Sequence, residues 1–332
     1  MAAWRTEPVP TRKPLKTGLT LYRLPTLVGD SLDPWLDIAR RAEAAGIDQV
    51  SVPDHVVFAE DARRNYPHGP DKFPSPLDES WPEPLIVLAG IAACTRSIRL
   101  STAVLISPIR SGVLLAKTLA TLDVLSNGRL DIVFGAGWQR EEFDACGMPF
   151  DGRLGHMVEQ IEACRTLWSA APASFHGKFI TFSEIYCLPF PRQLPGIPIW
   201  LGISPSERGA ARIGRLADGW TPAYPTPESV REGLAAIRPQ LIAHGRDPDC
   251  LDVRAGLMPV AGADGSVDLD ATFAQVPAYL AAGATMIDST TALVTRAEDV
   301  DEVIGRLVEV KRRFGSARKG SASLTNFDVP LS

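Results

Sequence analysis

The sequence predicts an α/β protein that folds as a single (β/α)8 barrel, also called a TIM barrel, with insertion segments. Short apolar runs alternate eight times with amphipathic helical segments along the 332 residues, and no Pro/Gly/Ser-rich linker divides them. This number of units and this length suit one barrel. An open doubly wound sheet is the alternative architecture. We expect the domain to span residues 16–315, between an N-terminal extension at 1–15 and a polar C-terminal tail at 316–332.

The first units are marked by strand and helix signals in the expected order. A buried strand is expected from Lys16 to Leu24, and a helix from Ser31-Leu-Asp33-Pro34, where a capping side chain precedes a proline in the first turn. A second strand, Asp48 to Val52, follows the stop at Gly46. The next elements are expected as a helix at 83–94, a strand at 98–105, a helix that ends at Asn127-Gly128, and a strand at 130–134.

The second half continues the alternation around two insertions. Residues 56–82 form a long loop rich in proline and aromatic side chains, which is typical of a lid over a site. Residues 174–195 are expected as an irregular insertion with short strands. Strands are predicted at 198–202, 219–222, 251–260 and 284–288, and helices at 207–217, 230–243, 271–282 and 297–314.

Composition excludes several classes of protein. The net charge is −5 and no basic run appears, which argues against a nucleic-acid binder. The most apolar stretch, Leu85 to Cys94, is shorter than the roughly 20 residues that span a bilayer, so no membrane association is expected. The first residues contain no apolar secretory segment, and the five cysteines are dispersed without a CxxC pair. These features predict reduced thiols and a cytoplasmic location.

Asp54-His55 is the first candidate site, because it follows the second predicted strand. Chemistry in α/β folds is carried at the carboxyl ends of the strands. Histidine exchanges protons near neutral pH, and an adjacent carboxylate influences its charge and tautomer. The alternative is structural: Asp54 caps a turn and His55 packs beside it.

Gly135-Ala-Gly137 is the second candidate. The third glycine of a GxGxxG motif is replaced by Arg140, and the segment follows the fourth strand instead of the first, so a Rossmann site is excluded. The glycines either let the backbone approach a flat cofactor or make a simple tight turn.

The segment Gly202-Ile-Ser204-Pro-Ser206 is the third candidate, because it joins a strand to a helix. Free N–H groups at a helix N-terminus and two hydroxyls suit an anion. The alternative is that a serine acts only as the helix N-cap.

Metal and serine-hydrolase chemistry have no support in the motifs. The five histidines lie outside HxH and HExxH patterns, and no GxSxG motif is present. A barrel with glycines and an anion loop at its strand ends, and with no expected metal site, suggests that an organic cofactor carries the chemistry.

Several segments, taken in order, resemble the bacterial luciferase-like superfamily of flavin- and deazaflavin-dependent oxidoreductases. The resemblance runs from about Gly18 to Pro222 and weakens afterwards. The segments that carry the resemblance are residues 42–46 together with 52–55, then 99–104, 116–130, 135–143, 175–179, 198–202 and 217–220. Residues 138–143 and 66–73 look most like the actinobacterial branch that uses coenzyme F420.

The resemblance implies a barrel whose mouth holds the ring of the cofactor. A bulge after the third strand, often with a non-proline cis peptide, supports one ring face in this family, and it would involve Thr102, Ala103 and Val104. The resemblance also assigns proton transfer or substrate orientation to His55, with Asp54 positioning it.

Other roles follow from the same resemblance. Gly135, Gly137 and Trp138 would line the ring or the substrate edge, and Glu142 would support the loop. No metal is expected. The aromatic side chains Tyr22, Trp81, Trp138 and Trp220 suggest a pocket for a hydrophobic or ring-shaped molecule.

In relatives the loop after the fifth strand binds the phosphate of the cofactor, which matches Gly202, Ser204 and Ser206. Ile203 stands where relatives commonly carry a second glycine, which leaves fewer unhindered backbone N–H groups.

Three functions are compatible with these residues. The first is an F420-dependent oxidoreductase that transfers a hydride between the deazaflavin and a small, hydrophobic organic substrate. The second is a monooxygenase that uses reduced FMN, O2 and a partner reductase. The third, of another class, is a flavin-binding protein without turnover. Relatives are often dimers packed through barrel helices, so we expect a homodimer.

Overall fold

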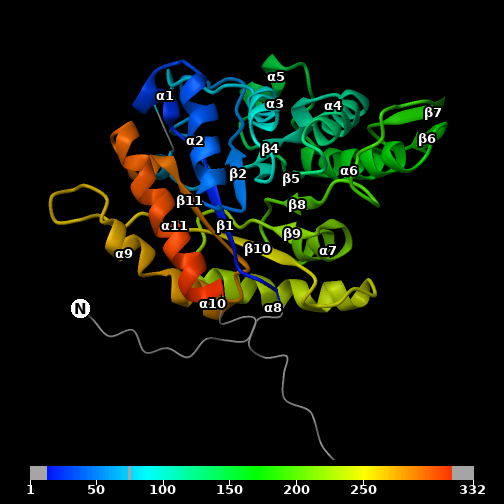
Figure 1. Cartoon of the computed structure of the whole chain (residues 1–332). Coiled ribbons are helices and arrows are strands. Elements are labelled where there is room, and N and C mark those ends of the chain that lie inside the picture. Colours follow the sequence, from blue (N-terminus) through cyan, green and yellow to red (C-terminus); the bar gives the residue numbers. More distant parts are fainter. Residues whose placement is uncertain (1–12, 74–75, 316–332) are drawn as a thin grey trace, which may run out of the picture.

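The computed structural model describes residues 13–73 and 76–315, and these form a closed parallel barrel covered by helices (Figure 1). The predicted fold class is therefore confirmed. The expected C-terminal tail, 316–332, lies outside the described residues, and so does the expected N-terminal extension except for residues 13–15. Within the described residues, no helix is long and apolar enough to cross a membrane.

Nine strand segments make the barrel wall, and two of them, β3 and β4, are parts of one interrupted strand. β1 pairs with β2 and β11, and β3 pairs with β5, so the wall closes on itself. The segments are β1 (Lys16–Thr20), β2 (Gln49–Val52), β3 (Arg99–Thr102), β4 (Leu105–Ile106), β5 (Leu130–Gly135), β8 (Ile199–Leu201), β9 (Gly219–Trp220), β10 (Asp252–Gly256) and β11 (Met286–Thr290).

Helices pack outside the wall and bury its apolar residues in one continuous core. The longer ones are α2 (Asp33–Ala44), α3 (Pro84–Cys94), α4 (Gly112–Leu125), α6 (Arg153–Ser169), α7 (Glu207–Leu216), α8 (Pro227–Ala243), α10 (Val276–Ala282) and α11 (Val300–Gly315). The short ones are α1 (Leu24–Val28), α5 (Arg140–Ala145) and α9 (Leu269–Phe273).

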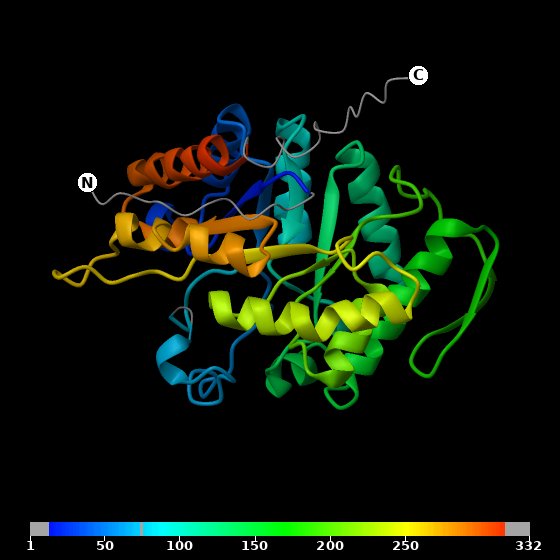
Figure 2. The ribbon, with the colours of Figure 1, turned by 90° about the horizontal axis from the view of Figure 1, so that it is seen from below.

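Both predicted insertions, residues 56–82 and 174–195, interrupt the regular alternation of strands and helices. β6 (Ala173–His176) and β7 (Thr181–Ile185) form an antiparallel hairpin, which confirms the short strands expected within 174–195. The hairpin projects from the edge of the molecule in Figures 1 and 2. The loop 56–82, light blue in Figure 2, lies next to one end of α8. It is thereby positioned beside one end of the barrel.

Several predicted elements differ from the structure, and the strand expected at 251–260 is shorter, ending at Gly256. The first strand ends at Thr20, and the left-handed Arg23 leads into α1, which the apolar run had concealed. The N-cap of α2 is Leu32, but the hydroxyl of Ser31 accepts a 3.3 Å hydrogen bond from the N–H of Asp33, so the expected capping side chain is present one residue before the N-cap. The helix expected at 271–282 is two helices: Asp268 caps α9, which ends at Phe273, and α10 begins at Val276 with Pro277 in its first turn.

Candidate functional site

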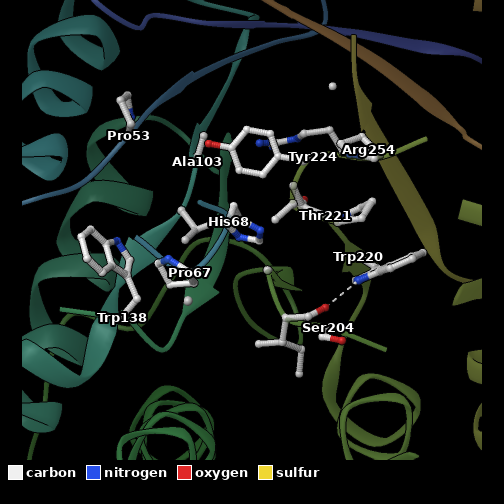
Figure 3. A pocket seen from close by; sticks show the side chains of 18 of the residues that line it. Pro53, Pro67, His68, Ala103, Trp138, Ser204, Trp220, Thr221, Tyr224 and Arg254 are labelled. Carbon is white, nitrogen blue, oxygen red and sulfur yellow. Dashed lines mark hydrogen bonds between the residues drawn. The ribbon is translucent and has the colours of Figure 1, made fainter. Parts of the chain in front are cut away.

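A pocket of about 1120 Å³ lies at the carboxyl end of the barrel strands (Figure 3). Its lining residues follow the ends of successive strands, as the barrel geometry requires. They include Thr20 and Tyr22, Pro53 to His55, Ala103 and Val104, Gly135 to Trp138, Gly202 to Ser206, Thr221, Gly256 and Asp288. All three sequence candidates therefore meet in one cavity.

His55 lies in this pocket with a carboxylate behind its ring. Its Nδ1 lies 3.2 Å from Oε2 of Glu142, which is fully buried, while the His55 side chain keeps 11% of its surface exposed. Glu142 also accepts a 2.7 Å hydrogen bond from the backbone N–H of Val56. Glu142 thus contacts both His55 and the first residue of the loop 56–82, and the loop-supporting role expected for it stays a prediction.

Asp54 does not hydrogen-bond to His55, so the positioning role expected for it is wrong. Its carboxylate accepts two bonds from the Arg110 guanidinium, of 2.6 and 3.0 Å, and a third from the backbone N–H of Ile106 at 2.8 Å. Burial raises the pKa of Asp54, and Arg110 opposes that shift. Asp54 therefore anchors the chain after the third strand, and Glu142 replaces it as the partner of His55.

The interruption between β3 and β4 is the expected bulge. The Ala103–Val104 peptide is cis, and both residues line the pocket. Thr102 is not among the lining residues: its hydroxyl is buried and donates to the backbone oxygen of Val133 at 3.1 Å. The ring contact expected from Thr102 is therefore wrong, because the strand turns its side chain toward β5.

The glycines of β5 and β8 make room for Val104. A Cβ on Gly135 would meet Val104 Cγ2 at 2.3 Å, and a Cβ on Gly202 would meet Cγ1 at 2.6 Å. Gly137 has a φ of +71°, and its Cβ would meet Phe143 at 2.8 Å. Tight packing against the bulge thus explains Gly135 and Gly202, whereas Gly137 is explained by its positive φ and by its packing against Ile106 and Phe143; all three line the pocket.

The loop between β8 and α7 contributes Ser204 and Ser206 to the pocket. Ser206 caps α7 by accepting a 3.3 Å hydrogen bond from the N–H of Gly209, so the N-cap alternative is correct for this residue. α7 begins directly after Ser206, so its N-terminus follows the two hydroxyls that line the cavity. This arrangement suits an anionic group such as a phosphate.

Aromatic rings surround His55 on one side of the pocket. The ring centroid of His55 lies 5.1 Å from that of Trp81 and 5.9 Å from that of Trp138, and Tyr22 packs against Trp81 at 5.6 Å. We call His55, Trp81, Trp138 and Tyr22 the aromatic wall.

Trp220 was expected beside these rings, but it lies elsewhere. Its Nε1 donates to the backbone oxygen of Ile203 at 3.0 Å, and its ring packs on α8 at Gly233. In Figure 3 the indole extends away from the pocket, so only part of Trp220 reaches the lining.

The opposite side of the pocket is polar, and sequence analysis missed it. Thr20, Arg254 and Asp288, from β1, β10 and β11, line it, and we call them the polar wall. Figure 3 shows Arg254 across the pocket from Trp138. Burial raises the pKa of Asp288 and lowers that of Arg254. A charged residue within a strand that is otherwise buried was the available signal.

A pair of tyrosines joins the two sides over the pocket. The hydroxyl of Tyr66, in the loop 56–82, lies 2.8 Å from that of Tyr224, which precedes α8. Tyr224 also donates to the backbone oxygen of Lys72 at 3.0 Å. Burial raises the pKa of Tyr66. The predicted lid is thus attached to the barrel on its far side.

Within the described residues, no three His, Cys, Asp or Glu side chains are placed to hold a metal ion. The five cysteines are all free.

Comparison with known proteins gives a family. Residues 14–309 match the family described as luciferase-like monooxygenase. An uncharacterized protein of Mycobacterium tuberculosis is 33% identical over 210 residues, which cover 63% of this chain and 74% of that protein. The FMNH2-dependent dimethylsulfone monooxygenase of Pseudomonas putida is 30% identical over 166 residues, covering 49% of this chain and 45% of that enzyme.

A solved structure shares the fold over most of the chain. The coenzyme F420-dependent tetrahydromethanopterin reductase of Methanopyrus kandleri superposes with a TM-score of 0.68 at 17% identity, covering 89% of this chain and 98% of that one. At this identity the likeness concerns the fold alone.

Proposed function

The chain belongs to the luciferase-like monooxygenase family and is an oxidoreductase, and from this premise we propose that it transfers a hydride between coenzyme F420 and a small organic molecule. One observation carries the proposal: His55 lies in the pocket at the strand ends, with its Nδ1 on the fully buried carboxylate of Glu142. A histidine held in this way suits proton exchange beside a hydride acceptor or donor.

The residues of the pocket fit a flat cofactor with a phosphate. The cavity of about 1120 Å³ is wide enough for a tricyclic ring, and the Ala103–Val104 peptide offers it a backbone surface. Ser204, Ser206 and the N-terminus of α7 would hold the phosphate. When bound, the deazaflavin supplies or accepts the hydride.

Other side chains of the pocket orient the imidazole of His55 and shield it from water. Glu142 fixes the orientation of the imidazole through Nδ1, so Nε2 is the nitrogen that exchanges the proton with the substrate. Trp81 and Trp138 pack against the same imidazole and exclude water from it.

A second candidate is a monooxygenase that uses FMNH2 and O2 with a partner reductase. The 30% identity to the FMNH2-dependent enzyme of Pseudomonas putida favours it. The intact pair of His55 and Glu142 argues against a flavin-binding protein without turnover, which needs no oriented base.

Cofactor titration tests the choice. Purified protein is mixed with F420 and, separately, with FMN, and the fluorescence of each ligand is followed. We expect F420 to bind more tightly than FMN. Tight binding of FMN without a response to F420 would overturn the proposal in favour of the monooxygenase, and binding of neither would overturn both.

We further propose a homodimer built on the face formed by α3 and α4. An apolar groove of about 560 Å³ lies between these helices, and Ile86 and Leu114 expose 67% and 65% of their surface beside it. Apolar side chains this exposed are typical of interfaces. Sedimentation of the wild type and of Leu114→Asp tests this: a wild-type monomer would overturn it. A cytoplasmic location stays a prediction.

A further inference from the structure

His68 is a second imidazole in the pocket, and the proposed function gives it no role. It belongs to the loop 56–82, lines the cavity and is exposed. Among the described residues, no hydrogen bond joins its ring nitrogens to another part of the chain. In Figure 3 its ring lies between the labelled side chains of Trp138 and Thr221. The nitrogens of His68 are therefore available to a molecule in the cavity.

Ring contacts hold His68 at this position. Its ring centroid lies 4.7 Å from that of Tyr224 and 5.5 Å from that of Tyr66. Tyr224 donates its hydroxyl proton to the backbone oxygen of Lys72, so Tyr66 is the donor in the 2.8 Å contact between the two tyrosine hydroxyls. Both tyrosines are thereby fixed, and they support the imidazole without using its nitrogens.

The charge state of His68 indicates what kind of group it binds. Burial lowers its pKa, and the neighbouring charge of Lys72 lowers it further, so the ring is neutral at neutral pH. A neutral imidazole carries one N–H donor and one acceptor nitrogen. It has no charge with which to attract an ion, and it matches a hydroxyl group, which also donates and accepts.

The two imidazoles stand at the two ends of a chain of ring contacts. The ring centroid of Trp138 lies 5.9 Å from that of His55 and 5.1 Å from that of Tyr66. Tyr66 in turn contacts His68. We call His55, Trp138, Tyr66 and His68 the ring row, and all four line the pocket. An apolar body that packs along the two middle rings brings its two ends to the two imidazoles.

We propose that His68 binds a hydroxyl group of the organic substrate, at the end of the molecule remote from the group that reacts at His55. The substrate class is then an elongated apolar molecule with a polar group at each end. This inference rests on the proposed function, because that function makes His55 the reacting end of the ring row. It narrows the hydrophobic or ring-shaped molecule that the aromatic residues suggested in the sequence.

The test uses 6-hydroxy-2-tetralone and 2-tetralone as probes, which share a two-ring body and a ketone and differ in one hydroxyl at the far end. Ligand-observed NMR measures the binding of each probe to the full chain, with and without F420. We expect the wild type to bind the hydroxylated probe about fivefold more tightly, because its hydroxyl gains a hydrogen bond to His68.

Variants of His68 show whether this residue causes the preference. His68→Phe keeps a ring against Tyr66 and Tyr224 but removes both nitrogens, so it should bind the two probes equally. His68→Ala, which removes the ring as well, should also lose the preference. His68→Gln supplies a donor and an acceptor and should restore it. His244→Phe, at an exposed histidine after α8, is the matched control and should keep it. Circular dichroism checks that each variant is folded.

The outcomes separate this inference from the proposed function. Equal binding of the two probes by the wild type, no binding of the hydroxylated probe, or an unchanged preference in folded His68→Phe or His68→Ala overturns the inference. If His68→Phe weakens the binding of F420 about tenfold, His68 serves the cofactor, and the inference is overturned as well. Failure of F420 and FMN to bind, with the preference present in the wild type and lost in His68→Phe, overturns only the proposed function.

Discussion

The aromatic wall and the polar wall line one pocket, with Trp138 across from Arg254, but their ionisable side chains are paired differently. On the aromatic wall, His55 is paired with Glu142, and the neighbouring Asp54 is paired with Arg110. On the polar wall, Asp288 and Arg254 each keep an unpaired buried atom. Trp81 Nε1 on the aromatic wall is unpaired as well, so the walls differ in how their ionisable groups are held: the imidazole is fixed by a carboxylate, whereas Asp288 and Arg254 are fixed by the uncharged side chains of Thr20 and Ser101.

The largest effect is expected from the aromatic wall. His55→Ala should lower turnover of an identified substrate by about 10²–10⁴-fold, because proton transfer by a positioned side chain contributes this much. Steady-state kinetics measures the change, and fluorescence titration should show cofactor binding within about threefold of the wild type. His244→Ala, on the surface, is the control. Unchanged turnover in His55→Ala would remove the role assigned to His55.

The next effect distinguishes the structural role of Asp54 from the role of His55 in turnover. Asp54→Ala should lower the free energy of unfolding by about 3 kcal/mol, because it leaves the half-buried Arg110 guanidinium without its main partner. Denaturant unfolding measures the loss, with His55→Ala as the matched variant. If both variants are equally stable, Asp54 is not the structural anchor that the contacts indicate.

A smaller effect is expected at Gly202, which packs against Val104 of the bulge. Gly202→Ala should weaken cofactor binding about tenfold, because overpacking against Val104 costs about 1–3 kcal/mol. Gly305→Ala on α11, where a Cβ meets nothing within 4 Å, is the control in the same fluorescence titration. Wild-type affinity in Gly202→Ala would show that Val104 moves aside freely.

The smallest effect is expected at the Tyr66–Tyr224 pair, which connects the loop 56–82 to the segment before α8. Tyr224→Phe removes the hydroxyl that bonds to Tyr66 and to the oxygen of Lys72. With about 1 kcal/mol for such a bond, KM should rise about fivefold while kcat changes little. A fall in kcat with constant KM would mean that the pair acts on the chemical step instead of on loop closure.

Sequence periodicity was sufficient for the barrel because each strand and helix is a local pattern. It was insufficient at α1 and at the break near Pro277, where apolar residues continue through a change of element. Within the site, the locations of His55, Gly135 and Ser204 at strand ends were predictable, and all three line one pocket.

The partners of these residues were not predictable, because they join segments far apart in the chain. Glu142 lies 87 residues from His55, and Arg110 lies 56 residues from Asp54. An adjacent Asp-His pair indicates a contact between neighbours, but the folded backbone turns the two side chains toward different partners. Arg254 and Asp288 lie on β10 and β11, which pair directly with each other, so the pairing of these two strands alone brings them to one wall.

The packing around Val104 limits which substitutions this part of the pocket tolerates. Its two methyl groups occupy the space beside Gly135 and Gly202, so residues 104, 135 and 202 share one fixed volume. A larger side chain at either glycine requires a smaller one at 104, and alanine at 104 would make each such change tolerable. In a library designed to reshape the pocket, these three codons should therefore be randomised together, because a larger residue at 135 or 202 alone meets Val104.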